Sequence, residues 1–125
     1  MKFSTNSTMT KILDELFSSY SERVPNVRKI TSEMVKNGMV KDQNEIINDH
    51  VAFRTMGVKN LGINSFEKIF LAHGYEKRDF FHFKVKKLDA YWYAPPTPDL
   101  PRIFISELKV DLLSKKVRKI IRKYT

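Results

Sequence analysis

Apolar residues at helical spacing predict two helices at the start of the chain. In residues 10–21 they recur every three or four positions, and Thr10 precedes them as a candidate N-cap. Pro25 favours the first turn of a second helix, where its missing N–H group leaves no hydrogen bond unmade. Gly38 then supplies the left-handed residue that ends this helix. The sequence therefore predicts a helical N-terminal segment, residues 1–40.

The pattern changes to alternation of polar and apolar positions after a polar linker, residues 41–45. A first strand is predicted over residues 46–55, and the helix after it is capped by Asn64 or Ser65 and ended by Gly74. Three further strands and a closing helix capped by Ser114 are predicted at residues 75–83, 88–94, 102–110 and 114–124. The fold class is α+β, with N-terminal helices, a βαβββ module and a C-terminal helix.

Length and composition favour one soluble domain. The chain has 125 residues, of which 42% are hydrophobic. We expect a single domain over residues 1–125, in which residues 45–124 form the βαβββ module with its closing helix. The chain lacks cysteine, which excludes disulfide scaffolds, cysteine nucleophiles and cysteine-ligated zinc or iron–sulfur sites. No apolar run is long enough for a membrane span or a signal peptide, so we expect a cytoplasmic protein with no membrane partner.

The positive charge is concentrated near the C-terminus. The formal net charge is +9. Residues 1–62 contain nine basic and seven acidic residues, whereas residues 63–125 contain fourteen basic and seven acidic ones. Six of the basic residues lie in the closing helix, which contains no acidic residue. Such a run can bind nucleic-acid phosphates but is more often a solvated face, so a nucleic-acid-binding module is the less favoured interpretation.

The first strand carries the candidate chemistry. Because successive side chains point to opposite faces, Asn48, His50, Ala52 and Arg54 share one face, while Phe53 belongs to the other. Histidine is a common metal ligand, and a guanidinium binds a carboxylate through two parallel hydrogen bonds. The Cα atoms of His50 and Arg54 are roughly 13 Å apart in an extended strand. The pattern permits a metal site with an acidic substrate, and it also permits an ordinary solvated strand.

Three blocks of sequence resemble a known enzyme family. They are Asp49–Thr55 (DHVAFRT), Lys86–Pro96 (KKLDAYWYAPP) and Leu100–Leu108 (LPRIFISEL). In this order they resemble the N-terminal portion of 2-oxoadipate dioxygenase/decarboxylases, also called hydroxyglutarate synthases. The resemblance covers roughly residues 45–124. Proteins of that family are similar to vicinal oxygen chelate proteins, which agrees with the predicted βαβββ module.

The resemblance implies an oxidoreductase with an iron cofactor. Enzymes of the family use Fe(2+) and O₂ to convert 2-oxoadipate, a small 2-oxo dicarboxylic acid, into 2-hydroxyglutarate and CO₂ in lysine degradation. Two histidines and a glutamate hold their iron. The first histidine corresponds to His50, and Arg54 corresponds to an arginine that binds a substrate carboxylate. The other two ligands belong to a later portion, so we expect the N-terminal part of a longer enzyme that needs a second module or another copy as partner.

Other residues have less certain roles. Glu107 lies on the last strand, where vicinal oxygen chelate modules place a ligand, but it is more typical of a packing or hydrogen-bonding residue. His73 and His82 are more typical of structural histidines, and Trp92 of a sheet residue. Arg102 could join Arg54 as a second anion-binding group, but it falls on the face opposite Glu107, and we assign it no role. No catalytic residue is assigned, and a single-module dimer that binds a metal or small molecule without this activity is the alternative.

Overall fold

A computed structural model describes residues 7–125 of the chain. Its internal contacts divide the chain into two compact units, with the boundary between Asp49 and His50. The helical unit and the module that begins at His50 are therefore described separately. The expectation of one domain stays a prediction. Within the described residues no helix is both long and apolar enough to cross a membrane.

The helical unit contains α1 (Thr8–Arg23), α2 (Pro25–Lys36) and the short 3-10 helix η1 (Gln43–Glu45). Thr10 is not the cap of α1, so that prediction is wrong. Ser7 is the cap: its side chain accepts a hydrogen bond from the Thr10 amide, and the Thr10 hydroxyl accepts one from the Ser7 amide. Pro25 begins α2 as predicted, and Gly38 has a φ of +70° after its end.

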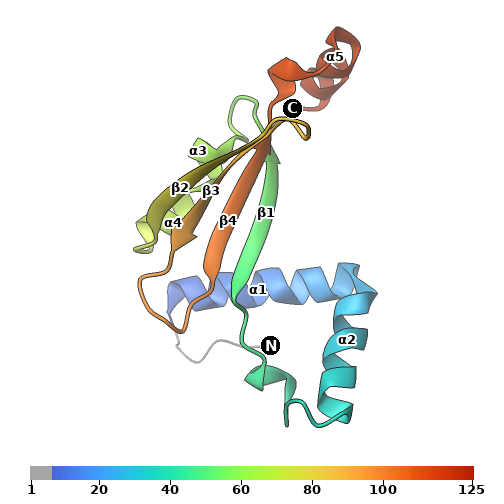
Figure 1. Cartoon of the computed structure of the whole chain (residues 1–125), viewed down its shortest axis with the longest axis vertical. Helices are drawn as coiled ribbons and strands as arrows, with labels where there is room; N and C mark the ends of the chain where they lie inside the picture. The colour runs from blue at the N-terminus through green and yellow to red at the C-terminus, as the bar shows by residue number, and fades with distance from the viewer. Residues whose placement is uncertain (1–6) are drawn as a thin grey trace. The chain divides into compact units, whose positions relative to one another are not determined.

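The second unit is a four-stranded sheet with helices, shown in Figure 1. The strands lie in the order β1-β4-β3-β2; β1 is parallel to β4, and the other neighbours are antiparallel. The elements are β1 (His50–Met56), α3 (Ile63–Phe66), α4 (Lys68–Ala72), β2 (Glu76–Phe83), β3 (Leu88–Ala94), β4 (Arg102–Leu108), η2 (Val110–Leu112) and α5 (Lys115–Tyr124). The predicted βαβββ order and α+β class are confirmed, although β1 begins later than expected.

An aromatic cluster joins the two short helices to one face of the sheet, which we call the helix face. The ring of Phe53 on β1 lies 5.1 Å from that of Phe66 and 5.6 Å from that of Phe70, measured between centroids. The ring of Tyr75 meets Phe70 edge-on at 5.6 Å, and its hydroxyl donates to the carbonyl of Pro101 at 2.9 Å. Burial, with a smaller contribution from the charge of Asp99, raises the pKa of Tyr75 to about 12.

A buried carboxylate completes the helix face. Glu67, at the junction of α3 and α4, accepts a hydrogen bond from the Tyr93 hydroxyl at 2.5 Å. The ammonium of Lys77 lies 2.8 Å from the same Glu67 oxygen and 4.0 Å from the centroid of the Tyr91 ring. Burial and the hydrogen bond to Glu67 raise the pKa of Tyr93. The charge of Glu67 is thus compensated by a cation and a hydroxyl donor.

The helix between the first two strands differs from the prediction. It is interrupted at Glu67 into α3 and α4, and it begins at Ile63 with Gly62 as N-cap. Neither Asn64 nor Ser65 caps it. The cap residue, Gly62, has no side chain that could accept a hydrogen bond from α3. Instead, the carboxylate of Glu107 on β4 accepts one from the Ile63 amide.

Helix α5 lies beyond the end of the sheet (Figure 1). The predicted cap is confirmed, because the Ser114 hydroxyl accepts a hydrogen bond from the Val117 amide at 3.4 Å. No residue of α5 is buried, and the apolar residue Ile120 is 52% exposed. The basic residues of the helix are consistent with a solvated face.

Replacing Phe70 should weaken the module most. Phe70 is 1% exposed, so Phe70→Ala should lower the free energy of unfolding by about 3–5 kcal/mol through lost burial and a cavity. Denaturant unfolding followed by fluorescence of the single tryptophan, Trp92, measures this change. Ile69→Ala is the matched control on the same helix, because Ile69 is 45% exposed and should cost less than about 1.5 kcal/mol. Equal losses for the two variants would contradict the aromatic core.

Candidate functional site

The parallel pairing of β1 with β4 brings three basic side chains to one face of the sheet. His50 is in register with Arg102, Ala52 with Phe104, and Arg54 with Ser106. Residues paired across a sheet project to the same side, so His50, Arg54 and Arg102 share a face, which we call the His50 face. All three side chains are exposed. The shared face predicted for His50 and Arg54 is found, whereas their roles stay predictions.

The centre of the His50 face combines small and aromatic side chains. Ser106 is in register with Ala90, and Ala90 with Phe81, so two small side chains separate Arg54 from an aromatic ring. The Phe81 and Phe104 rings lie 6.1 Å apart, and Phe81 is 40% exposed. The indole nitrogen of Trp92 donates to Asp79 at 2.8 Å. An apolar surface therefore lies beside the basic groups.

Glu107 lies on the helix face, opposite His50. It is in register with Thr55, and one of its carboxylate oxygens accepts a hydrogen bond from the Ile63 amide at 2.9 Å. A Cβ atom added to Gly62 would lie 2.8 Å from that oxygen, and one added to Gly57 would lie 3.4 Å from the other. The connection from β1 to α3 is thus built around this carboxylate. Glu107 does not share a metal site with His50 inside this module, and the hydrogen-bonding interpretation of Glu107 is the one the structure supports.

The remaining histidines lie apart from His50. His82 is in register with Asp89 on the helix face, and its Nδ1 lies 2.6 Å from the Asp89 carboxylate. His73 follows α4, and its Nδ1 lies 2.7 Å from the carbonyl of Ile69. In the part of the chain that the structure describes, no three side chains of the metal-binding types gather around one point. The residues present therefore do not fit a complete Fe(II) site by themselves.

A polar cluster on the helix face also engages Asp89. The ammonium of Lys109 lies 3.0 Å from the Asp89 carboxylate and 3.8 Å from that of Glu107. Burial alone would raise the pKa of Asp89, but hydrogen bonds with His82 and Lys109 outweigh it and hold the pKa below its usual value. The hydrogen bond to Asp89 in turn raises the pKa of Lys109. These charges compensate one another and stabilise the helix face.

Arg102 is the basic residue of the His50 face that sequence reasoning left without a role. Its position opposite Glu107 was expected and is found. The alternation along β4 alone cannot say which residues of β1 lie beside it. The register supplies that information: Arg102 lies directly across from His50. The βαβββ order, which allows the first and last strands to pair in parallel, is the signal that could have indicated this neighbour.

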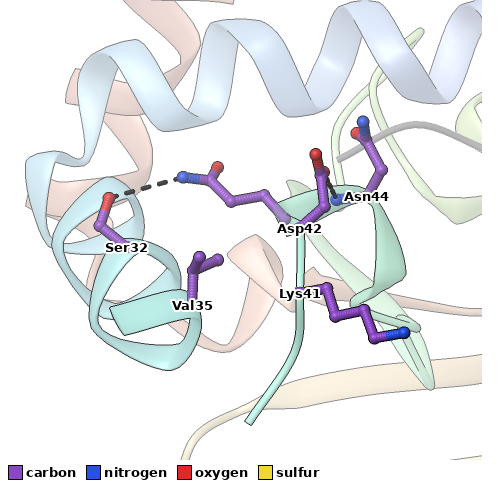
Figure 2. A pocket seen from close by; sticks show the side chains of 6 residues that line it. Ser32, Val35, Lys41, Asp42 and Asn44 are labelled. Atoms are coloured by element: carbon purple, nitrogen blue, oxygen red, sulfur yellow. Dashed lines mark hydrogen bonds between the residues drawn. The ribbon is translucent and has the colours of Figure 1, made fainter. Parts of the chain in front are cut away.

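A separate polar hollow lies within the helical unit, shown in Figure 2. The amide of Gln43 donates to the Ser32 hydroxyl at 3.5 Å across it, and the Asp42 carboxylate accepts from the Asn44 amide at 2.7 Å. Asp42 is the N-cap of η1, so these contacts shape the chain between α2 and η1. They hold the local backbone and indicate no ligand.

The fold defines the general class of the module. Its structure is similar to the crystal structure of a protein from Ralstonia eutropha JMP134 that is assigned to the glyoxalase superfamily, with a TM-score of 0.75 and 22% identity over 88% of this chain and 35% of that one. At this level of identity the similarity shows the fold alone. Residues 12–125 also match the family model of 2-oxoadipate dioxygenase/decarboxylase. The chain belongs to this family.

Two relatives have a higher sequence identity. The chloroplastic 2-oxoadipate dioxygenase/decarboxylase of Arabidopsis thaliana is 38% identical over 99% of this chain and 35% of the relative. The crystal structure of the Oryza sativa hydroxyglutarate synthase in complex with 2-oxoadipate is 40% identical, with a TM-score of 0.80 over 91% of this chain and 38% of that chain. The chain therefore spans somewhat more than a third of these relatives. The expectation of a cytoplasmic location stays untested.

Removing the charge of Glu107 should loosen the start of α3. Glu107→Gln should lower the free energy of unfolding by about 1–3 kcal/mol, because a charge-assisted hydrogen bond to a backbone amide is weakened. Denaturant unfolding measures the change. Glu76→Gln is the control, because the Glu76 side chain is 68% exposed and its change should stay within about 0.5 kcal/mol. A Glu107→Gln variant as stable as this control would contradict the assigned contact.

Asp89 should make the stability of the module depend on acid pH. Because the pKa of Asp89 is lowered on folding, its contribution is complete above about pH 5 and is lost as the pH falls below about 4 toward its folded value. Asp89→Asn should lower stability at pH 7 and flatten the loss between pH 5 and 2, measured by denaturant unfolding at each pH. Asp111→Asn, in which the replaced side chain is 79% exposed, should keep the wild-type slope. An unchanged slope for Asp89→Asn would exclude this linkage.

Proposed function

We propose that this chain is the N-terminal module of an Fe(II)-dependent 2-oxoadipate dioxygenase/decarboxylase, an enzyme that converts 2-oxoadipate and O₂ into 2-hydroxyglutarate and CO₂ in lysine degradation. The observation that carries the proposal is the exposed pair His50 and Arg54 on one face of β1, in a chain that matches the family over residues 12–125. Membership of the family supports the reaction class, and the side chains support the substrate class.

The chemistry of the His50 face supports an acidic substrate. The relative from rice, 40% identical, has been crystallised with 2-oxoadipate. A guanidinium binds a carboxylate through two parallel hydrogen bonds, which fixes both the position and the orientation of the acid. In this proposal Arg54 holds one carboxylate of the substrate and thereby positions the 2-oxo group.

His50 is proposed as one ligand of the iron. The imidazole is exposed on the same face as Arg54, as a shared metal and substrate site requires. Because the described residues offer no complete set of ligands, the other ligands are assigned to a second module, either in a longer chain or in another copy. Iron would supply the oxygen chemistry, and this module would supply one ligand and the substrate clamp.

A second candidate is a single-module protein that dimerises around a metal or small molecule and has no dioxygenase activity. The exposed apolar side chains of the His50 face favour it, because Phe81 and Phe83 are each 40% exposed and Met56 is 38% exposed. The first candidate predicts turnover of 2-oxoadipate once the second module is present, and the second candidate predicts none.

A chimera tests the proposed activity. Residues 12–125 of this chain replace the aligned portion of the rice enzyme, and O₂ consumption and 2-hydroxyglutarate formation are measured with 2-oxoadipate. The chimera should convert 2-oxoadipate into 2-hydroxyglutarate. His50→Ala should lower kcat/KM at least about 100-fold through loss of a metal ligand. Arg54→Lys should raise KM about tenfold, because lysine keeps the charge but not the paired hydrogen bonds.

The controls separate the site from the fold. His73→Ala removes a histidine outside the His50 face and should leave turnover within about twofold of the chimera. A folded chimera that produces no 2-hydroxyglutarate, or one whose activity survives His50→Ala, would contradict the proposal.

A further inference from the structure

Three separate segments of the chain meet at one end of the sheet. There the last residue of β1, Met56, is in register with Leu108, the last residue of β4. Leu108 is in register with Leu88, at the start of β3, and Leu88 with the last residue of β2. Figure 1 shows α5 beyond this end of the sheet. Three connections therefore begin there side by side: residues 57–62, 84–87 and 109–125.

The net positive charge of the chain is concentrated at this end. The three segments contain eleven basic residues and one acidic residue, whereas the rest of the chain contains twelve basic and thirteen acidic residues. Within residues 7–125, two of the eleven cations form ion pairs. Lys109 lies 3.0 Å from Asp89 and 3.8 Å from Glu107. Arg122 lies 3.4 Å from Asp111. This surface, which we call the basic end, therefore attracts anions.

The β2–β3 hairpin presents an aliphatic side chain between two lysines. Val85 is 94% exposed, and its neighbours Lys84 and Lys86 are exposed as well. An isolated exposed valine is common on protein surfaces. This one, however, lies at the basic end together with a larger apolar surface on α5.

Helix α5 divides its surface into an apolar and a cationic part. Its four apolar residues occupy about 100° of the helix circumference, and its six basic residues occupy most of the rest. No residue of α5 is buried: Ile120 is 52% exposed and Tyr124 is 78% exposed. An apolar arc bordered by lysine and arginine is typical of helices that lie at the surface of a bilayer. The apolar arc of α5 consists of Val117, Ile120, Ile121 and Tyr124.

The exposed aliphatic residues distinguish a lipid surface from other polyanions. Nucleic-acid phosphates pair with lysine and arginine, but such contacts leave Val85 and Ile120 in water. At a bilayer the same two side chains enter the boundary between headgroups and acyl chains, where apolar surface is removed from water. Lysine and arginine keep their charged ends at the level of the phosphates while their methylene stems lie along this boundary. A bilayer thus satisfies both kinds of side chain at the basic end.

We propose that the basic end is a peripheral binding surface for anionic phospholipid bilayers. Its cations bind the phosphate and carboxylate groups of the lipids, while Val85 and the apolar arc of α5 enter the headgroup region. The surface lies beyond the strand ends, apart from the His50 face, so the inference does not depend on the proposed reaction. A peripheral contact needs no membrane-spanning segment, whereas the expected absence of a membrane partner rests on the length of apolar runs alone.

Co-sedimentation of the whole chain with sucrose-loaded vesicles tests the proposal. One set of vesicles contains phosphatidylcholine alone, and the other contains about 30% phosphatidylserine. Each lysine or arginine near such a surface strengthens binding roughly fivefold, so the partition coefficient should be at least about 100-fold higher on the anionic vesicles. It should fall steeply between about 0.1 M and 0.5 M salt, because exposed charges are screened.

Substitutions separate the charged and apolar contributions. Lys84→Gln/Lys86→Gln removes two cations from the hairpin and should lower the partition coefficient at least about tenfold. Val85→Ser and Ile120→Ser keep every charge and should each lower it at least about threefold, because burial of methyl and methylene groups is lost. All four residues are exposed, so the variants should keep the wild-type circular dichroism spectrum and unfolding midpoint.

The controls make the same changes in the helical unit. Lys29→Gln/Lys36→Gln removes two exposed cations from α2, and Ile30→Ser replaces an isoleucine that is 62% exposed. Because these residues lie outside the basic end, each control should change the partition coefficient less than about twofold. A wild-type chain that does not prefer the anionic vesicles, or losses in the controls as large as those at the basic end, would overturn the proposal.

Two further measurements address other occupants of the basic end. A duplex oligonucleotide that binds more tightly than the anionic vesicles, with an affinity unchanged by Val85→Ser and Ile120→Ser, would assign the surface to nucleic acid and overturn the proposal. The chimera of the activity test should bind the anionic vesicles as the chain does. A folded chimera that does not bind them would assign the apolar arc to the second module and overturn the proposal. Vesicle binding by a chimera without turnover would exclude the reaction and retain the membrane surface.

Discussion

The parallel pairing of β1 with β4 is the constraint on which the candidate site depends. Each strand alone specifies only which of its side chains share a side, and the pairing joins the two sets in one fixed register, His50 with Arg102 and Arg54 with Ser106. A slip by one residue would move every side chain of β1 to the other face. The aromatic contacts of Phe53 with α3 and α4 oppose such a slip, because they require Phe53 on the helix face. Packing on one face therefore preserves the arrangement of charges on the other.

The two faces of the sheet use their charged side chains differently. On the helix face, carboxylates hold secondary structure together: Glu107 binds the start of α3, and Glu67 binds a tyrosine hydroxyl and a lysine. On the His50 face, β1 and β4 present two guanidinium groups and an imidazole. Each of these helix-face acids is compensated by a donor or a cation on the same face.

Local sequence patterns predicted many features that are local in physical origin, although the cap of α1 is Ser7 and not Thr10. Alternation in β1 placed His50 and Arg54 together, and the residue preferences of helix ends identified Pro25, Gly38 and Ser114. Features that arise from long-range contacts were missed. The cap of α3 comes from a carboxylate 44 residues away in sequence, which no local rule detects. The position of Arg102 beside His50 likewise follows from strand register, a property of two segments rather than of either one.

The close approach of Gly62 to the Glu107 carboxylate makes the start of α3 sensitive to substitution at two distant positions. The space that a Cβ atom at position 62 would need is already filled by a side-chain oxygen, at 2.8 Å. A side chain at position 62 would displace the Glu107 carboxylate, and a smaller residue at 107 would open room at 62 but remove the acceptor for the Ile63 amide. The effects on stability of substitutions at positions 62 and 107 should therefore not be additive.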